Sequence, residues 1–370
     1  MKLAAIRALA LALCVPAWAA AAEFTAEAFE PAEALFRQDP RWLGSDGAVS
    51  TALGDGRIFW SFDDSFVAIS PTGGRDGSVM VRNSIAIQSG LDPLTARMDF
   101  HWRASGTGQP GSFFPDPDPA WYWTGAALRL DQGPLVSFLF TMEATPGEAL
   151  GFQPAGYALA VIHDPDAPPG EWLPRITPGP VTQFDALPAA ALVREGEHVV
   201  GLALKQHGTH AGALVRFRSA DLANGMLDAA EWWAGEDRGW LPAGELGARG
   251  PEYVIEDAGA EASLHWDQRM QAWVHVAAYG FGAGEIGVRT APRLTGPWSA
   301  VQRVYRPPES DRPGTLVYAA MAHPALAAPQ PGAILVTYAT NSSDFSELFS
   351  PGGARALYWP RVVVLTPRFR

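Results

Sequence analysis

One predicted β-hairpin places the strongest constraint on how this chain folds. A Gly-Asp-Gly turn at residues 54–56 separates a small-residue segment, Ala48 to Leu53, from an alternating apolar segment, Arg57 to Phe62. An Asp-Gly turn between two such segments is a strong signal for a tight antiparallel hairpin. The pattern therefore predicts two paired strands whose outer ends lie next to each other.

The outer ends of this hairpin carry acidic side chains. Asp46 precedes the first strand, and Asp63 and Asp64 follow the second. Because paired antiparallel strands bring these ends together, we expect Asp46 and Asp64 to lie within several ångströms of each other. Two convergent carboxylates are what glycoside hydrolysis requires. The alternative is that Asp46 and Asp64 only form turns.

The N-terminal segment has the pattern of a secretory signal peptide. Lys2 and Arg7 precede a short apolar stretch, Ala8 to Val15, and small residues from Ala17 to Ala22 offer cleavage sites. We therefore expect residues 1–22 to be removed and the mature protein to be exported to the periplasm or the extracellular space. No other segment is long and apolar enough to span a bilayer, so we expect no membrane insertion.

Cysteine content and charge limit the chemistry and the partners. Cys14 is the only cysteine and lies in the predicted signal peptide, so the mature chain is expected to have no disulfide and no thiol chemistry. A lipoprotein signal at Cys14 is an alternative, although Val15 is large for that processing site. No metal and no other cofactor is expected. The net charge of −12 argues against nucleic acids and anionic membranes as partners.

The rest of the chain has the pattern of an all-β fold. The 38 Gly and 32 Pro residues punctuate short apolar segments, and long helical periods are absent. The predicted strands form about five groups of about 60–70 residues, and this repetition indicates a five-bladed β-propeller of four-stranded antiparallel blades. A β-sandwich is the alternative. We predict a single domain over residues 41–370, preceded by an N-terminal extension, residues 23–40.

Several motifs resemble those of a bacterial propeller family. They are Asp46-Gly47, the turn at 54–57, the run from Trp60 to Phe66, Val81 to Ser84, Trp121 to Trp123, Arg289 to Trp298, and His323-Pro324 with Asn341. On these motifs, the chain from Arg41 onward resembles the family of domain of unknown function 4185. Part of that family is glycoside hydrolase family 183, the endo-acting D-arabinanases. The family usually has Gly-Asp where this chain has Asp63-Asp64.

The resemblance implies a catalytic pair. Asp64 would be the nucleophile at the anomeric carbon in a retaining mechanism, and Asp46 the general acid and then the base. The residues expected to bind substrate around this pair are Asp63, Arg82, Asn83, Trp123, Glu285 and His323.

Each of these assignments has a structural alternative. Asn83 is equally a strand-end cap, Trp123 a core residue, and His323 a structural hydrogen-bonding group. Glu143 and Glu285 are alternative acids, which we rank below the Asp46/Asp64 pair. The run from residue 163 to 166, His-Asp-Pro-Asp, is expected to be a solvated loop and not a metal site.

The sequence therefore predicts a secreted, monomeric glycoside hydrolase that acts on a polysaccharide, with D-arabinan as the specific substrate. Two other classes remain open. One is a non-catalytic propeller that binds carbohydrate, and the other is an interaction scaffold in the cell envelope.

Overall fold

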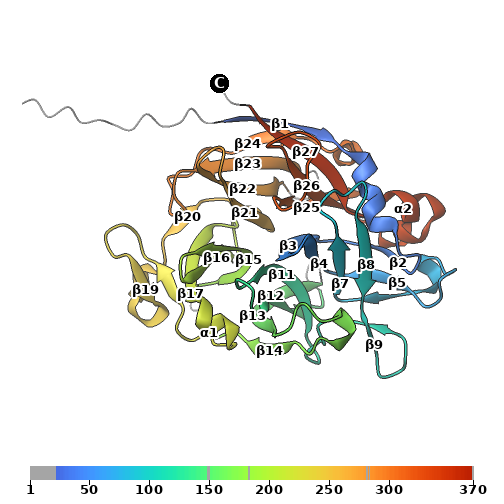
Figure 1. The fold of residues 1–370 in the computed structure, drawn as a ribbon, viewed down its shortest axis with the longest axis horizontal. Helices are drawn as coiled ribbons and strands as arrows, with labels where there is room; N and C mark the ends of the chain where they lie inside the picture. Colours follow the sequence, from blue (N-terminus) through green and yellow to red (C-terminus); the bar gives the residue numbers. More distant parts are fainter. Residues whose placement is uncertain (1–21, 148–150, 182–183, 281, 283, 369–370) are drawn as a thin grey trace, which may run out of the picture.

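The computed structural model describes residues 22–147, 151–181, 184–280, 282 and 284–368. The predicted signal peptide, apart from Ala22, lies outside these residues. The described chain is dominated by β-strands (Figure 1), which confirms the all-β prediction. Its helices are short: α1 (Ser219–Ala223), α2 (Pro351–Ala356), and 3₁₀ turns at Glu30–Arg37, Arg75–Gly77, Pro169–Glu171, Ala243–Glu245, Gly247–Arg249, Pro308–Asp311 and Phe345–Phe349. Among the described residues, no helix has the length and apolarity needed to cross a bilayer.

Five sheets contain most of the strands, and the first strand of each lies near the centre of the molecule (Figure 1). In hydrogen-bonded order they are β3 (Val49–Gly54), β4 (Arg57–Phe62), β7 (Ser84–Ser89) and β8 (Arg97–His101); β11 (Trp121–Arg129), β12 (Leu135–Ala144), β13 (Phe152–Ile162) and β14 (Arg175–Pro178); β15 (Ala186–Glu195), β16 (His198–Lys205), β17 (Gly212–Arg218), β18 (Glu231–Trp233) and β19 (Trp240–Pro242), with β20 (Tyr253–Ile255) beside β17; β21 (Ala262–Asp267), β22 (Ala272–Tyr279), β23 (Glu285–Ala291) and β24 (Gln302–Tyr305); and β25 (Thr315–His323), β26 (Ile334–Ser342), β27 (Arg361–Arg368) and β1 (Glu23–Ala28).

The sheets are less uniform than the predicted set of four-stranded blades. The sheet that starts at β15 has six strands. Two further sheets lie outside the five: one is formed by β2 (Trp42–Ser45), β5 (Ser65–Ala68) and β6 (Ser78–Val81), and the other by β9 (Arg103–Ala104) and β10 (Pro110–Gly111). Both are built from the connections around β4, β7 and β11, so they add structure next to the predicted acidic hairpin.

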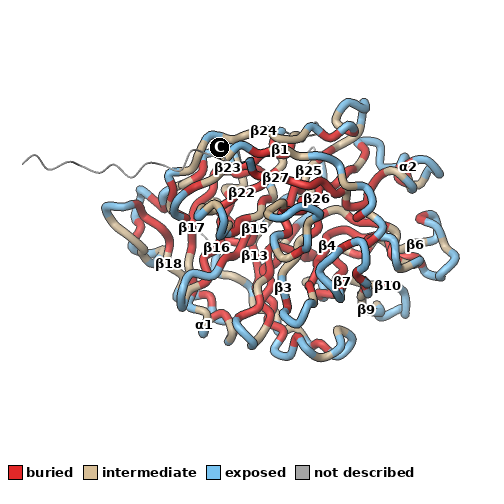
Figure 2. The backbone as a smooth tube through the Cα atoms, turned by 45° about the horizontal axis from the view of Figure 1, so that its top comes forward, coloured by how far each residue is buried: buried red, intermediate tan, exposed pale blue. Residues whose placement is uncertain are grey.

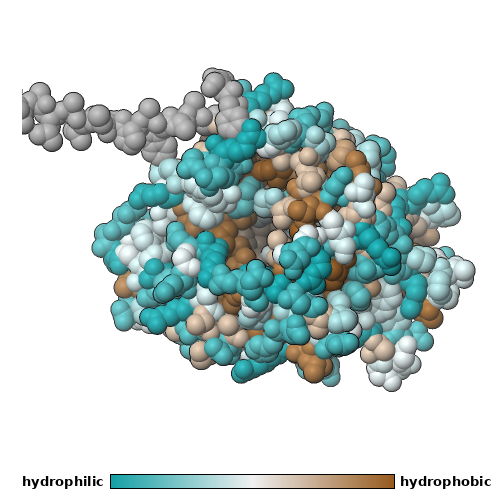
Figure 3. Space-filling view, viewed as in Figure 1, coloured by the Kyte–Doolittle hydropathy of each residue, from teal (hydrophilic) through white to brown (hydrophobic). Residues whose placement is uncertain are grey.

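The first strands of the five sheets form a closed cycle of neighbours. β3 contacts β11, β11 contacts β15, β15 contacts β21, β21 contacts β25, and β25 contacts β3. A channel of about 340 Å³ lies between them, and its lining includes an alanine from each of the five first strands. Figure 3 shows a hollow near the centre of the molecule, bordered by hydrophobic residues. Backbones approach closely here: a Cβ on Gly125 would lie 2.4 Å from the carbonyl oxygen of Ala189, so small residues are required.

The predicted hairpin is confirmed as β3 and β4. The two strands pair from Val49 with Ser61 to Gly54 with Arg57. Asp55 and Gly56 at the turn have φ values of 52° and 72°, as a two-residue type I′ turn requires. The outer face of β4 then packs into an aromatic cluster.

This aromatic cluster anchors the hairpin to the body of the fold. Trp42, Trp60 and Phe62 are fully buried. Trp42 stacks on Phe100 of β8 with 4.4 Å between ring centroids, and Trp60 packs edge-on against Phe36 at 5.3 Å. Figure 2 shows the same trend throughout the molecule, with buried residues along the central strands and exposed residues in the peripheral loops. Rings of this size fix the strand positions because each removes a large apolar area from water.

The segment predicted as an N-terminal extension contributes to the last sheet. β1 pairs antiparallel with β27, so the first and the last strand of the described chain lie side by side (Figure 1). Phe24 of β1 is buried in the core cluster between the fourth and fifth sheets. The pairing of β1 with β27 therefore links the two ends of the described chain.

We expect Phe24→Ala to lower the free energy of unfolding by about 3 kcal/mol, because it removes a buried ring and leaves a cavity. Glu27→Ala, an exposed position on the same strand, is the matched control and should change stability by less than about 0.5 kcal/mol. Urea unfolding followed by tryptophan fluorescence measures both. Equal stability of the two variants would show that β1 does not hold the fold together.

Candidate active site

Carboxylates gather at one end of the central channel, where the first strands begin. Asp46 precedes β3, Asp63 and Asp64 follow β4, and Glu261 immediately precedes β21. The backbone N–H of Asp63 donates to the carbonyl oxygen of Asp46 at 3.1 Å. The charge of Asp46 acts on Asp63 and on Glu261, and the charge of Asp64 acts on Asp46. The structure thus brings Asp46 and Asp64 together and adds Glu261 to them.

The Tyr318 hydroxyl holds Asp46. It donates to Oδ2 of Asp46 at 2.7 Å, and the amide of Asn341 donates to the Tyr318 oxygen at 3.1 Å. Burial and the negative charge of Asp64 raise the pKa of Asp46 to about 7, against the hydrogen bond from Tyr318 that lowers it. Asp46 therefore titrates near neutral pH.

Asp64 has cationic and neutral donors on its carboxylate. The indole N–H of Trp123 donates to Oδ1 at 3.1 Å, and Nη1 of Arg82 lies 3.3 Å from both oxygens. Burial raises the pKa of Asp64, while Arg82 and Trp123 oppose that rise by stabilising the charged form. The Arg82 guanidinium also stacks over the ring of Trp121 at 4.5 Å, which fixes its position.

Glu261, unlike Asp64, has no side-chain donor on its carboxyl group among the described residues. Burial and the charge of Asp46 raise the pKa of Glu261 to about 8. A pKa of about 8 favours the protonated form of Glu261 at neutral pH. Groups with such opposed environments are the usual acid and base of an active site.

Asp63 bonds to Thr124 of β11. Its Oδ1 accepts from the backbone N–H of Thr124 at 2.6 Å and from the Thr124 hydroxyl at 3.0 Å. A Cβ on Gly47 would lie 2.7 Å from Oδ2, so glycine is needed beside it. Burial raises the pKa of Asp63 well above its usual range. Asp63 therefore joins the first sheet to the start of β11, and its geometry favours a structural role over substrate binding.

Asn83 and His323 are also engaged within the protein. The Asn83 amide bonds to the backbone of Phe114 and Tyr122 with three contacts of 2.7–3.1 Å. His323 bonds to the Ser50 hydroxyl at 2.7 Å and to the Thr337 hydroxyl at 2.8 Å. Burial lowers the pKa of His323 to about 3, so it stays neutral and links β25 to β3 and β26.

The alternative acids lie in ion pairs or on the surface. Glu285 pairs with Arg303 at 3.1 Å and with Arg306 at 3.4 Å. Glu143 is exposed and accepts from the Gln153 amide at 2.7 Å. Neither acts on the charges of Asp46, Asp63 or Glu261. The structure does not bring them into the acid group.

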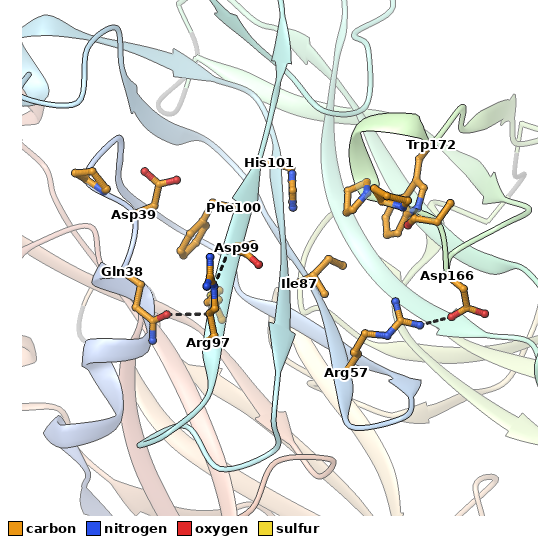
Figure 4. Close-up of a pocket in the computed structure, with 15 residues that line it drawn as sticks. Gln38, Asp39, Arg57, Ile87, Arg97, Asp99, Phe100, His101, Asp166 and Trp172 are labelled. Carbon is orange, nitrogen blue, oxygen red and sulfur yellow. Dashed lines mark hydrogen bonds and ion pairs between the residues drawn. The ribbon is translucent and has the colours of Figure 1, made fainter.

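A larger cavity lies elsewhere, against β8 and the loop before β14. It measures about 880 Å³, and none of the clustered carboxylates lines it. Figure 4 shows Asp166 meeting Arg57 across this cavity. Asp166 also pairs with Arg129 at 2.6 Å, so the 163–166 run is a loop held by ion pairs. Its charges are already matched, and the cavity offers no group poised for chemistry.

Sequence reasoning missed Glu261, Tyr318 and Tyr358. Glu261 had a usable signal, because it directly precedes the first strand of the most regular repeat, as Asp46 precedes β3. The two tyrosines had none. The register of β25 with β26 shifts directly after Tyr318. Tyr358 has a left-handed conformation with φ of 64°. Neither feature can be predicted from the residue pattern.

The family assignment made from the motifs is wrong. Residues 31–367 match the family described as "Domain of unknown function (DUF5005)" and not the family of domain of unknown function 4185 or glycoside hydrolase family 183. The motifs misled because the run from Arg289 to Trp298 and the Gly-Asp-Gly hairpin reflect strand and turn requirements that sugar-acting propellers share.

Solved structures with the same fold include glycoside hydrolases. A provisionally named hydrolase from Bacteroides ovatus superposes with a TM-score of 0.72 at 19% identity, over 92% of this chain and 90% of that chain. The catalytic domain of a GH62 α-L-arabinofuranosidase from Coprinopsis cinerea superposes with a TM-score of 0.50 at 12% identity, over 94% and 97%. At these identities the similarity establishes the fold alone, an all-β fold like that of the propeller glycoside hydrolases.

One curated relative matches part of the chain. It is a "Probable DNA ligase" from Anaeromyxobacter sp. (strain K), 33% identical over 129 residues. The match covers 33% of this chain and spans a quarter of that protein's length. So partial a match does not carry the relative's activity to this chain.

The raised pKa of Glu261 makes stability depend on pH. An unfolded glutamate ionises near pH 4.3, whereas the folded protein keeps the proton up to about pH 8. The folded state binds more protons across this range, so Glu261 lowers stability as pH rises. We expect Glu261→Gln to stabilise the fold more at pH 8 than at pH 5, by about 1–3 kcal/mol.

Thermal unfolding of the wild type and the variant at both pH values measures this difference. Glu256→Gln is the matched control, because Glu256 is exposed and belongs to the same connection; its effect should be the same at both values. If Glu261→Gln also acts equally at pH 5 and pH 8, the carboxyl does not titrate as described.

Proposed function

The chain belongs to the DUF5005 family, and we propose that it is a glycoside hydrolase in which Asp64 and Glu261 carry out the reaction. Asp46 interacts electrostatically with both of them. One observation carries this proposal. Asp64 has donors that favour its ionised form, while Glu261, at the same end of the channel, has no side-chain donor among the described residues and has a pKa raised to about 8. Glycoside hydrolysis needs this combination of one carboxylate and one carboxylic acid.

The scaffold in this proposal is a five-bladed propeller. The five sheets, the closed cycle of first strands and the channel between them support this arrangement. Strand pairing of β1 with β27 supports the inclusion of the segment before residue 41 in the same domain. Sites at one end of a propeller channel draw residues from several blades, and here the acids come from the first and fourth sheets.

In the first step, Glu261 gives its proton to the glycosidic oxygen while a carboxylate oxygen of Asp64 attacks the anomeric carbon. The bond from that carbon to the leaving sugar breaks, and a glycosyl-enzyme forms on Asp64. In the second step, ionised Glu261 takes a proton from water, and the water oxygen displaces Asp64. This retaining scheme keeps Asp64 in the role expected from the sequence and gives the acid role to Glu261.

Asp46 is then the residue that tunes the acid. Its hydrogen bond from Tyr318 favours the ionised form, and its charge contributes to the high pKa of Glu261. Because the charge of Asp46 acts on Glu261, a change in the ionisation of one group shifts the titration of the other. The higher pKa of Glu261 favours Glu261 over Asp46 as the proton donor, and the contacts of Arg82 and Trp123 support them as the groups that hold Asp64.

The proposed substrate is a polysaccharide outside the cytoplasm. The signal-peptide pattern of residues 1–22 supports export. The proposed enzyme acts as a monomer. D-Arabinan is one substrate to test among furanose- and pyranose-containing glycans from bacteria and plants. The proton NMR spectrum of the first product anomer distinguishes retention from inversion.

Three variants test the roles. We expect Asp64→Asn to abolish release of reducing ends from every substrate. Glu261→Gln should lose about 10²–10⁴-fold on the natural glycan, because it lacks the proton for the leaving group. The same variant should keep most of its rate on an aryl glycoside whose leaving group needs no protonation. Glu285→Gln, whose partners are the surface arginines 303 and 306, is the control and should retain full activity.

Two results would overturn the proposal. Unchanged turnover by Asp64→Asn would remove the nucleophile from the mechanism. Binding of glycans by the wild type without turnover of any of them would indicate a carbohydrate-binding protein, the second class expected from the sequence.

A further inference from the structure

An exposed tryptophan lies at the end of the channel opposite the acid group. Trp266, near the end of β21, is 38% exposed, and it is the only exposed tryptophan among the described residues. Glu261 directly precedes β21, and Trp266 follows it by five positions. At a rise of about 3.3 Å per residue, the strand separates the two by about 16 Å. Trp266 therefore lies outside the acid group and needs an explanation of its own.

The Trp266 ring is held in a fixed position. Trp266 pairs with Trp273 across β21 and β22, and the two rings meet edge-on with 5.4 Å between centroids. Nε1 of Trp266 donates to Oε1 of Gln268 at 3.2 Å. Trp273 in turn packs against the core cluster between the third and fourth sheets. A ring that is already fixed loses little conformational entropy when a ligand packs on it.

Two cavities meet at Trp266. One is the channel of about 340 Å³, and the other, of about 380 Å³, lies between the β21–β22 turn and the segment before β26. His265, Trp266 and Pro324 line both of them. Cavities of this size suit a small ring-shaped group. A stable protein interface buries about 800 Å² on each partner, far more than the exposed part of one tryptophan offers.

Polar groups without protein partners surround the ring. His265 is 8% exposed, and neither of its ring nitrogens has a hydrogen-bond partner among the described residues. Buried polar atoms are normally hydrogen-bonded. In the described part of the chain, the indole N–H of Trp273 and the side-chain amide of Gln330 are also without partners. A ligand that carries hydroxyl groups supplies both donors and acceptors to such a set.

The charged side chains that line the two cavities balance each other. Arg194 pairs with Asp131 at 2.7 Å, and Asp267 and Arg269 carry opposite charges in the same turn. Burial lowers the pKa of His265 to about 4, so its ring is neutral. The site therefore favours an uncharged ligand over an anion or a cation.

We propose that this end of the channel is a second, non-catalytic carbohydrate-binding site, in which a sugar ring of a neutral glycan stacks on Trp266 and its hydroxyls bond to polar groups of the two cavities. A sugar ring has one apolar C–H face and a rim of hydroxyls, which matches a fixed aromatic face beside unpartnered donors and acceptors. Binding here involves neither Asp64 nor Glu261. The inference therefore goes beyond the proposed function and is tested without turnover.

The first test is affinity electrophoresis of the Asp64→Asn protein in gels that contain D-arabinan, L-arabinan, xylan or galactan. We expect at least one of these glycans to slow its migration. In the same background, Trp266→Ala should weaken that binding about fivefold or more, because the stacking face is lost. Trp266→Phe keeps a ring and should retain most of the affinity. Leu94→Ala, an exposed apolar position outside both cavities, is the control and should bind as the parent does.

The second test locates the bound glycan. ¹⁹F NMR of the Asp64→Asn protein labelled with 5-fluorotryptophan reports each indole, and the Trp266 signal is identified by its loss in Trp266→Phe. Addition of the glycan that slows migration should shift this signal. Slowed migration with an unmoved Trp266 signal would place the glycan at the acid group and overturn the proposal. Unchanged affinity in Trp266→Ala, or a parent that none of the four glycans slows, would overturn it as well.

These outcomes separate the second site from the proposed function. A wild type that hydrolyses no glycan, but whose Trp266 signal shifts on glycan addition, would overturn the hydrolase and support the binding site. An active wild type whose binding is the same with and without the Trp266 ring would support the hydrolase and overturn the binding site.

Discussion

Four carboxyl groups lie close together at one end of a narrow channel, and the surrounding structure must offset the repulsion between their charges. Strand pairing brings together four acids, Asp46, Asp63, Asp64 and Glu261. Because they are buried, water screens the repulsion between their charges less than it would at the surface. Each charge is met differently. Arg82 and Trp123 donate to Asp64, Thr124 donates to Asp63, the Tyr318 hydroxyl donates to Asp46, and the pKa of Glu261 is raised to about 8. The four carboxyl groups therefore differ in how strongly the protein favours their charged forms, as the proposed reaction requires.

Below the carboxylates, a ladder of hydroxyls fixes the backbone. The Ser45 hydroxyl lies 2.6 Å from the Asp46 carbonyl and 2.9 Å from the Asp64 carbonyl, and the Ser65 hydroxyl bonds to Ser84 at 2.7 Å. The Trp42 indole donates to Ser84 at 3.0 Å. Because serines are short, this ladder holds the two acidic turns at a set separation while the aromatic cluster keeps water away from it. The precision of the site thus depends on residues that touch no substrate.

The sequence allowed the acidic hairpin to be placed, but not its surroundings. The turn at 54–56 and the strand alternation locate Asp46 and Asp64, because they depend on local preferences. Asp63 and Asp64 are adjacent in sequence but have different partners. Only the packing of β11 determines which of them bonds to Thr124. Glu261 is about 200 residues away from both in sequence and meets them only when the cycle of sheets closes. The carbonyl oxygen of Tyr358 lies 3.5 Å from Nη2 of Arg75, a contact between distant segments that no local pattern encodes.

The same argument explains why the family could not be read from motifs and why fold similarity does not give the activity. Turns, bulges and small residues around a channel are requirements of the architecture, so unrelated functions share them. In this chain the acids differ in their donors: Arg82 and Trp123 contact Asp64 and oppose the rise in its pKa. The proposed activity therefore depends on a few side-chain contacts: donors on Asp64 and Asp46, and no side-chain donor on Glu261 among the described residues.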